Sequence, residues 1–181
     1  NKNRFCQVVL FRFWKIAVIL PNWILLSTKL YRKYSKRGRR EGKKVLPVAV
    51  NLSRMDLMDK DIMSRIWDNV KDTRVPVSMF HYELTESAYA DITESGSKFL
   101  TGLQNQGAKI LIDDFGSGIS SFSTVRDYEF DIIKLDMGFV QKIGTSKKTD
   151  NILIALIDLA HSLDMKVIAE GVETKEQVEF L

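Results

Sequence analysis

Polar residues that can bind a metal ion or a phosphate stand where short apolar runs end. These residues are Asn51, Glu83, Asp113, Asp114, Lys134 and Glu170. Carboxylates that converge in one cleft repel one another and raise each other's pKa values, and a divalent cation removes that penalty. Because the candidate ligands offer only oxygen atoms, they favour Mg²⁺ or Mn²⁺ over zinc.

The same residues predict a reaction. Two hard ions about 3.5–4 Å apart form a site for in-line attack of water on a phosphodiester. Lys134 would then neutralise a phosphate oxygen or hold the attacking water, and Glu170 would accept its proton. The adjacent pair Asp113–Asp114 precedes a Phe-Gly-Ser-Gly loop, which indicates one ligand and one residue directed at the water or a second ion. For each acid alone, a helix N-cap or a loop ion pair remains an alternative.

The elements that must position these side chains are short strands alternating with helices. The apolar runs are Val45–Val50, Val77–Tyr82, Lys109–Ile112, Phe130–Ile133 and Lys166–Ala169. Helical periodicity lies between them at Ile62–Val70 and Ile152–Leu163, and Gly107 is placed as a helix C-terminal cap. The polar residues that end the runs are 32, 30, 21 and 36 positions apart, the rhythm of repeated βα units with parallel strands.

The fold class follows from this rhythm. No glycine-rich phosphate fingerprint follows the first strand, so a TIM-type (βα) barrel is favoured over a dinucleotide-binding sheet. In such barrels the active site lies at the carboxyl ends of the strands, where the polar residues stand. We therefore predict an α/β barrel with its site at that end.

Charge divides the 181 residues unevenly. Residues 1–44 carry 13 Lys and Arg against one acid, a net charge of +12, whereas residues 45–181 carry 14 basic and 22 acidic residues, a net charge of −8. A uniformly basic nucleic-acid-binding domain is a poor fit, so neither DNA nor RNA is expected as a partner. The 45% hydrophobic content excludes general disorder, and a single Cys excludes a disulfide framework.

The first 44 residues allow several interpretations. Residues 8–26 are apolar but contain Arg12, Lys15 and Pro21, which argue against a membrane-spanning helix, and they lack the pattern of a signal peptide. The basic run Lys29–Lys44 could bind anionic lipid or RNA, although a solvated basic segment is the favoured interpretation. We therefore expect a cytoplasmic protein.

Ordered motifs in the rest of the chain resemble one known family. They are Val-Asn-Leu-Ser at 50–53, Glu-Leu-Thr-Glu-Ser at 83–87, Asp-Asp-Phe-Gly-Ser-Gly at 113–118, Ile-Lys-Leu-Asp at 133–136 and Ala-Glu-Gly-Val-Glu-Thr at 169–174. In order and spacing, residues 45–181 resemble the EAL domain family. The resemblance implies a barrel-type phosphodiesterase that opens cyclic di-GMP to a linear dinucleotide with Mg²⁺ or Mn²⁺, and that commonly forms a homodimer.

The resemblance also implies roles for individual residues. Metal ligands are expected at Asn51, Glu83, Asp113 and Asp114. Lys134 matches the lysine that positions the nucleophilic water, and Glu170 matches the acid proposed as general base. Glu86 matches the glutamate that steadies the Asp-Asp-Phe-Gly loop.

Departures from the family pattern define the domain prediction. The signature Glu-Ala-Leu strand, whose Glu would be a further metal ligand, is absent, and the chain ends before the family's last strand motif. We therefore expect an atypical segment at residues 1–44 and an incomplete EAL-like barrel at residues 45–181, belonging to a longer parent with a sensory or diguanylate cyclase domain. The alternative function is a catalytically inactive module that binds cyclic di-GMP or a protein partner.

A frameshift would account for the atypical segment. When the codons of Cys6–Ile24 are read in another frame, a synonymous choice of bases yields a sequence that resembles the family's stretch after its signature strand. We hypothesise a frameshift over the start of the chain that is resolved near Arg37–Glu41. Sequencing of the coding DNA decides this hypothesis.

Overall fold

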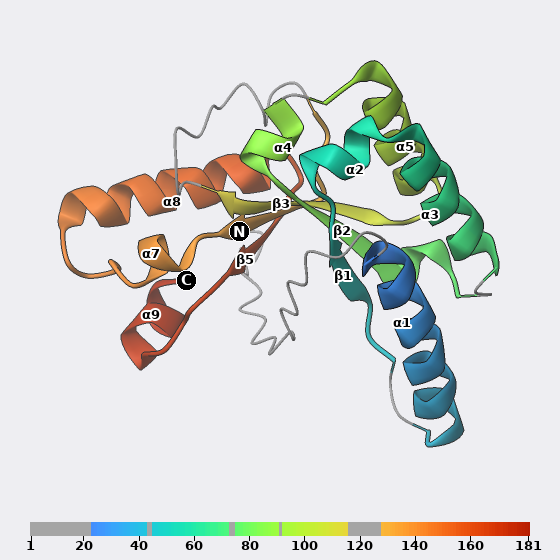
Figure 1. The fold of residues 1–181 in the computed structure, drawn as a ribbon. Helices are drawn as coiled ribbons and strands as arrows, with labels where there is room; N and C mark the ends of the chain where they lie inside the picture. Colours follow the sequence, from blue (N-terminus) through green and yellow to red (C-terminus); the bar gives the residue numbers. More distant parts are fainter. Residues whose placement is uncertain (1–22, 43–44, 73–74, 91, 116–127) are drawn as a thin grey trace. The chain divides into compact units, whose positions relative to one another are not determined.

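A computed structural model describes residues 23–42, 45–72, 75–90, 92–115 and 128–181 of the chain (Figure 1). These residues belong to two compact units. The N-terminal unit lies within Lys15–Ile110, and the C-terminal unit comprises the described residues from Leu111 to Leu181. The division falls inside strand β3 (Lys109–Phe115).

The N-terminal unit alternates helices with parallel strands. Its elements are α1 (Trp23–Arg40), β1 (Val48–Asn51), α2 (Arg54–Met58), α3 (Lys60–Asp72), the 3-10 helix η1 (Val77–Met79), β2 (Phe80–Thr85), α4 (Glu86–Ala90) and α5 (Glu94–Asn105). Strands β1 and β2 are parallel, and their register runs from Val48 opposite Phe80 to Asn51 opposite Glu83. The two candidate ligands of this unit, Asn51 and Glu83, therefore lie opposite each other in neighbouring strands.

The core of the N-terminal unit is built on β2. Phe80, Tyr82 and Leu84 are fully buried on this strand. Helix α1 covers the core with Tyr31, whose ring meets that of Phe80 edge-on with centroids 5.4 Å apart and whose hydroxyl donates to the carbonyl of Leu46. Since residues from both faces of β2 are buried, the strand behaves as the continuous apolar run predicts.

The C-terminal unit continues the same alternation. It contains the end of β3, β4 (Ile132–Leu135), α7 (Met137–Val140), α8 (Lys147–Ser162), β5 (Lys166–Ala169) and α9 (Lys175–Phe180). Strand β4 pairs in parallel with β3 on one side and with β5 on the other, and all of its residues are buried. A strand buried on both faces is typical of an α/β fold with helices over the sheet.

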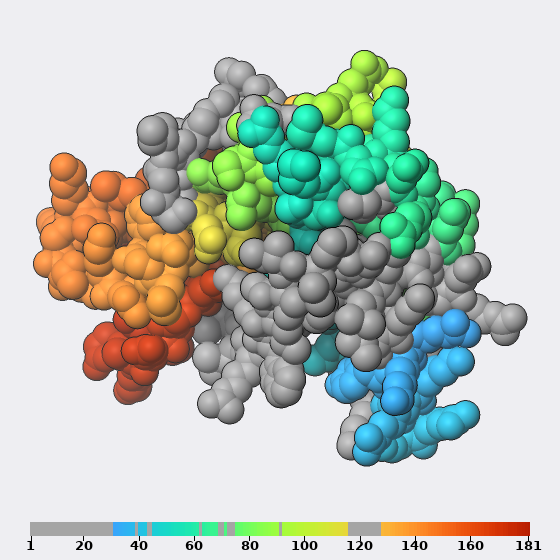
Figure 2. Space-filling model, viewed as in Figure 1, coloured from blue at the N-terminus to red at the C-terminus, as the bar shows by residue number. Residues whose placement is uncertain are grey.

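Helix α8 packs on this unit through one face, and its other face lies at the surface (Figure 2). Leu153 and Ala160 are buried, whereas Ile152 and Leu163 are about half exposed. The predicted periodicity therefore identifies the helix correctly, although the first and last residues of the apolar pattern lie at the surface. The helix begins after Ser146, whose hydroxyl accepts a hydrogen bond from the backbone N–H of Thr149.

The structure confirms the predicted fold class and elements. Each apolar run overlaps one strand, and β1, β2, β3 and β4 extend beyond the runs onto the polar residues that follow. Gly107 follows α5 with a φ of +93°, as a helix C-terminal cap requires. None of the described helices combines the length and apolarity needed to cross a membrane. Residues 8–22 of the apolar segment lie outside the described residues.

Candidate metal centre

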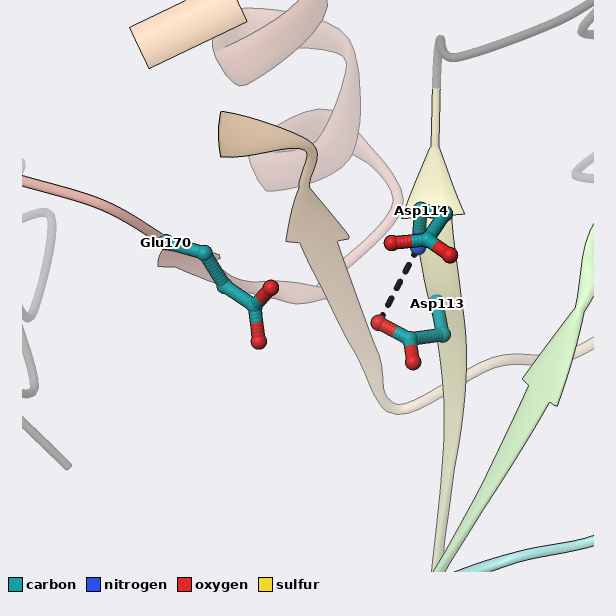
Figure 3. A group of neighbouring side chains, drawn as sticks. All are labelled: Asp113, Asp114 and Glu170. Carbon is teal, nitrogen blue, oxygen red and sulfur yellow. Dashed lines mark hydrogen bonds between the residues drawn. The ribbon is translucent and has the colours of Figure 1, made fainter. Parts of the chain in front are cut away.

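Three carboxylates of the C-terminal unit converge at the carboxyl ends of its strands. Asp113 and Asp114 lie near the end of β3, and Glu170 directly follows β5. Each residue offers an oxygen atom, and these atoms all lie within 4.8 Å of one another. Figure 3 shows the Glu170 side chain directed toward the two aspartates. The all-oxygen donor set is of the kind that Mg²⁺ or Mn²⁺ prefers.

Lys134 stands between these carboxylates, on the strand that separates β3 from β5. Its Nζ lies 2.7 Å from Oδ1 of Asp113 and 2.9 Å from Oε1 of Glu170. The side chains of Lys134 and Asp113 are only 7% and 5% exposed, whereas that of Glu170 is 32% exposed. One ammonium group thus offsets part of the negative charge of three carboxylates, and the remainder favours a cation.

An unusual backbone allows two consecutive residues to reach one centre. Successive side chains of a regular strand point to opposite faces. Asp114 instead has a φ of +52°, and the pairing of β3 with β4 shifts register between Ile112 and Phe115. The backbone N–H of Asp114 donates to Oδ1 of Asp113 at 3.0 Å. This local irregularity brings both carboxylates to the same side as Glu170.

The N-terminal unit holds the other predicted ligands. Asn51 is exposed at the end of β1, and Glu83 is buried in β2 opposite it in the register. The backbone N–H of Leu52 donates to the Glu83 carbonyl at 2.8 Å, so the parallel pairing continues past Asn51. The structure therefore places Asn51 beside Glu83, and it brings Asp113, Asp114, Lys134 and Glu170 together in the C-terminal unit.

Glu86 begins helix α4 and is half-buried. Its Oε1 atom is buried, and within the described part of the chain it has no hydrogen-bond partner. Of the Asp-Asp-Phe-Gly loop that it is expected to steady, Gly116 lies outside the described residues, and the role of Glu86 remains a prediction.

Two features near the centre were not singled out by the sequence interpretation. Gly171 follows Glu170 with a φ of +71°, and Asp136 caps helix α7 by accepting a hydrogen bond from the N–H of Gly138 at 2.8 Å. The available signals were the glycine in Ala-Glu-Gly and the aspartate that ends Ile-Lys-Leu-Asp. Both residues shape the chain directly after a strand that carries a site residue.

Comparison with protein families and curated proteins identifies relatives. The family model described as "EAL domain" matches residues 23–181. Signaling protein YkoW of Bacillus subtilis (strain 168) is 37% identical over 136 residues, which are 75% of this chain and 17% of that protein. Cyclic di-GMP phosphodiesterase PdeR of Escherichia coli (strain K12) is 30% identical over 167 residues, which are 92% of this chain and 24% of that protein. The chain thus spans less than a quarter of the length of these relatives.

Solved structures show the same fold. The EAL domain of Mycobacterium smegmatis DcpA matches with a TM-score of 0.77 at 28% identity, covering 90% of this chain and 72% of that one. A calcium and cyclic di-GMP complex of Klebsiella pneumoniae BlrP1 matches with a TM-score of 0.73 at 25% identity, covering 88% of this chain and 40% of that one. These likenesses support an EAL-type, TIM-barrel-like fold.

The family match begins at the first residue of α1. It therefore includes residues 23–44, which are part of the segment that we expect to be atypical. The domain boundary at residue 45 and the frameshift hypothesis remain predictions.

Proposed function

Because this chain belongs to the EAL domain family, we propose that it hydrolyses cyclic di-GMP to the linear dinucleotide with the help of two Mg²⁺ or Mn²⁺ ions. The observation that carries the proposal is the cluster of Asp113, Asp114 and Glu170 around the ammonium group of Lys134. A relative is named a cyclic di-GMP phosphodiesterase, and a related structure holds calcium and the dinucleotide, which supports the same substrate and a divalent ion here.

The residues take distinct roles in this proposal. The metal ligands are Asn51, Glu83, Asp113 and Asp114. When bound, the ions would polarise the phosphodiester and lower the pKa of the attacking water. Glu86 steadies the loop that follows Asp114.

Lys134 and Glu170 act on the water and its proton. Lys134 holds the water through its ammonium group, and Glu170 accepts the proton as the oxygen bonds to phosphorus. The bond from phosphorus to the leaving ribose oxygen breaks, and protonation of that oxygen balances the proton taken by Glu170. Because Glu170 lies within the same cluster, its charge also adds to the affinity for the cation.

We further propose that the chain works within a longer cytoplasmic signalling protein and as a homodimer. The length of the curated relatives supports a parent protein with sensory or diguanylate cyclase domains. The acidic excess of residues 45–181 argues against DNA or RNA as a partner, since both are polyanions.

A turnover assay tests the enzymatic proposal. The purified chain is mixed with cyclic di-GMP and either Mg²⁺, Mn²⁺ or EDTA, and the linear dinucleotide is separated by anion-exchange chromatography. Product should form with either metal, disappear with EDTA, and fall strongly in Asp113→Asn. Glu179→Gln, which removes an exposed carboxylate on α9, is the matched control and should retain activity.

The same assay separates the two candidate functions. A folded chain that binds cyclic di-GMP but forms no linear product would favour the catalytically inactive module. A folded chain that neither binds nor hydrolyses the dinucleotide would contradict both functions.

A further inference from the structure

The carboxylate of Glu170 is held by few contacts of its own. It lies just beyond the last register pair of β4 and β5, Leu135 opposite Ala169. Its backbone N–H donates to the carbonyl of Leu135 at 3.3 Å, and its side chain pairs with Lys134 at 2.9 Å. Since the side chain is 32% exposed, packing contributes only part of its position. The loop that leaves Glu170 must therefore be held by other residues.

Met137 contacts the first residue of that loop. A Cβ atom built on Gly171 would lie 2.3 Å from Cγ of Met137 and 3.0 Å from its Sδ. Real Cβ atoms do not approach other atoms so closely, so the Met137 side chain occupies the space that any larger residue would need. Gly171 also has a φ of +71°, which a residue with a Cβ adopts only with strain. Glycine is required here on both counts.

Helix α7 fixes the backbone from which Met137 extends. The helix begins after Asp136, whose carboxylate accepts from the N–H of Gly138, and the N–H of Gln141 donates to the Met137 carbonyl at 2.9 Å. Val140, at the end of α7, is fully buried. The backbone of Met137 is therefore anchored on the core of the C-terminal unit, while the residue as a whole is 47% exposed.

The other end of the loop is tied to the same helix. The Oε1 atom of Gln177 accepts hydrogen bonds from the N–H groups of Glu173 and Thr174 at 2.7 and 3.0 Å. Its Nε2 donates to the carbonyl of Val140 at 3.3 Å. Gln177 is buried, so its bond to Val140 lies away from solvent, whereas its bonds to Glu173 and Thr174 are partly buried. The loop 170–174 is thus clamped between Met137 at its start and Gln177 at its end.

We propose that Met137 is a positioning residue for Glu170, and this inference rests on the proposed function of Glu170. By filling the space above Gly171, Met137 sets the direction in which the chain leaves β5 and keeps the Glu170 carboxylate opposite Lys134. Met137 does not contact the reacting atoms in this proposal; it acts through the loop.

Amide hydrogen exchange on the metal-free chain tests the proposal without relying on activity. The Glu170 N–H should exchange faster in Met137→Ala and in Gly171→Ala, because both changes free or displace the loop. Met137→Leu, which keeps the bulk of the side chain, should exchange like the wild type. Met55→Ala removes an exposed methionine on α2 and is the matched control. Unchanged exchange of Glu170 in Met137→Ala would overturn the proposal.

Mn²⁺ titration of the same variants provides the second readout. We expect Gly171→Ala to weaken Mn²⁺ binding about tenfold, at the lower end of the effect of residues that orient ligands. Met137→Ala should weaken it less, and Gly171→Ala/Met137→Ala should bind more tightly than Gly171→Ala, because the added methyl group no longer meets a side chain. A double variant that binds as weakly as Gly171→Ala would contradict a role for Met137.

The two readouts keep this proposal separate from the proposed function. If the wild-type chain bound no Mn²⁺, the metal-dependent function would fail, whereas the exchange of the Glu170 amide would still decide whether Met137 positions the loop. If the wild type bound Mn²⁺ and the variants matched it in both readouts, only the positioning role would fail.

Discussion

The two units differ in how their buried polar groups are paired. In the C-terminal unit the buried groups near the strand ends are paired, with Lys134 contacting both Asp113 and Glu170. In the N-terminal unit, within the described residues, the Tyr82 hydroxyl and one oxygen of Glu86 are buried without a hydrogen-bond partner. The C-terminal unit therefore supplies, from its own residues, a cation that pairs with two of its three clustered carboxylates. In the N-terminal unit, the described residues provide no hydrogen bond to these two buried oxygen atoms.

This difference indicates how the predicted ligand set would be assembled. The C-terminal carboxylates share one cation, Lys134, before any ion binds. Asn51 and Glu83 are aligned by the strand register instead, so their placement depends on the backbone. In the proposed function both sets supply metal ligands, and the C-terminal carboxylates carry most of their charge.

The largest effect is expected from combining one ligand of each unit. Asp113→Asn and Glu83→Gln should each lower kcat/KM about 10³-fold, equivalent to about 4 kcal/mol of transition-state stabilisation. If the two ligands serve the same ions, as the proposed function has it, the double variant should lose far less than the product of the two losses. Steady-state kinetics with cyclic di-GMP measure this. A fully multiplicative loss would mean that the two units act on separate ions or steps.

The next largest effect is expected from removal of the buried ammonium group of Lys134. Lys134→Met should lower the free energy of unfolding by about 3 kcal/mol in EDTA, because it removes the positive charge that pairs with the buried Asp113 carboxylate. Urea denaturation monitored by circular dichroism measures the change. Lys98→Met breaks the exposed pair of Lys98 with Glu94 in the N-terminal unit and should have almost no effect. Equal effects of the two variants would refute a special contribution of the C-terminal pair.

Mg²⁺ binding should raise the free energy of unfolding by about as much as Lys134→Met lowers it. At a concentration of 100 times Kd, Mg²⁺ should raise the free energy of unfolding by about 2.7 kcal/mol, since it binds the folded state. Urea denaturation with Mg²⁺ and with EDTA measures the difference. Asp114→Asn should lose most of this stabilisation and Asn51→Ala a smaller part. If Asn51→Ala kept all of it, the N-terminal pair would not belong to the centre.

The smallest effect concerns the Tyr82 hydroxyl, which is buried without a hydrogen-bond partner among the described residues. Burial raises the pKa of Tyr82, so above about pH 10 the unfolded chain loses this proton while the folded chain keeps it, and the free energy of unfolding declines as the pH rises. Tyr82→Phe should raise the free energy of unfolding by about 1 kcal/mol at neutral pH and reduce its decline at alkaline pH. Tyr31→Phe, which removes the bond to the Leu46 carbonyl, should instead destabilise the chain. Destabilisation by Tyr82→Phe would show that its hydroxyl has a partner.

The sequence predicts the strands well because each one is a buried, mostly apolar run that ends in polar residues. The same pattern places Asp113, Lys134 and Glu170 at one edge, since the carboxyl ends of neighbouring parallel strands meet there. The α8 helix is predicted from its periodicity, although its buried face is not, because the apolar residues cover more of the helix than the core does.

The remaining details depend on contacts that a local pattern does not encode. The positive φ of Asp114 arises with a register shift between β3 and β4, and the contact of Met137 with Gly171 joins residues 34 positions apart. The missing partner of the Tyr82 hydroxyl is likewise a property of the packed core. Each of these features requires knowledge of which segments pack together, and the sequence alone does not provide it.

The left-handed backbone of Asp114 has a consequence for how such a chain evolves. At this φ, aspartate, asparagine and glycine are the residues that fit with least strain. A single nucleotide change converts an aspartate codon into an asparagine or a glycine codon. The acid next to Asp113 can thus be lost in one mutational step that leaves the backbone conformation accessible. A lineage under relaxed selection for hydrolysis could therefore become a folded receptor without first passing through an unstable protein.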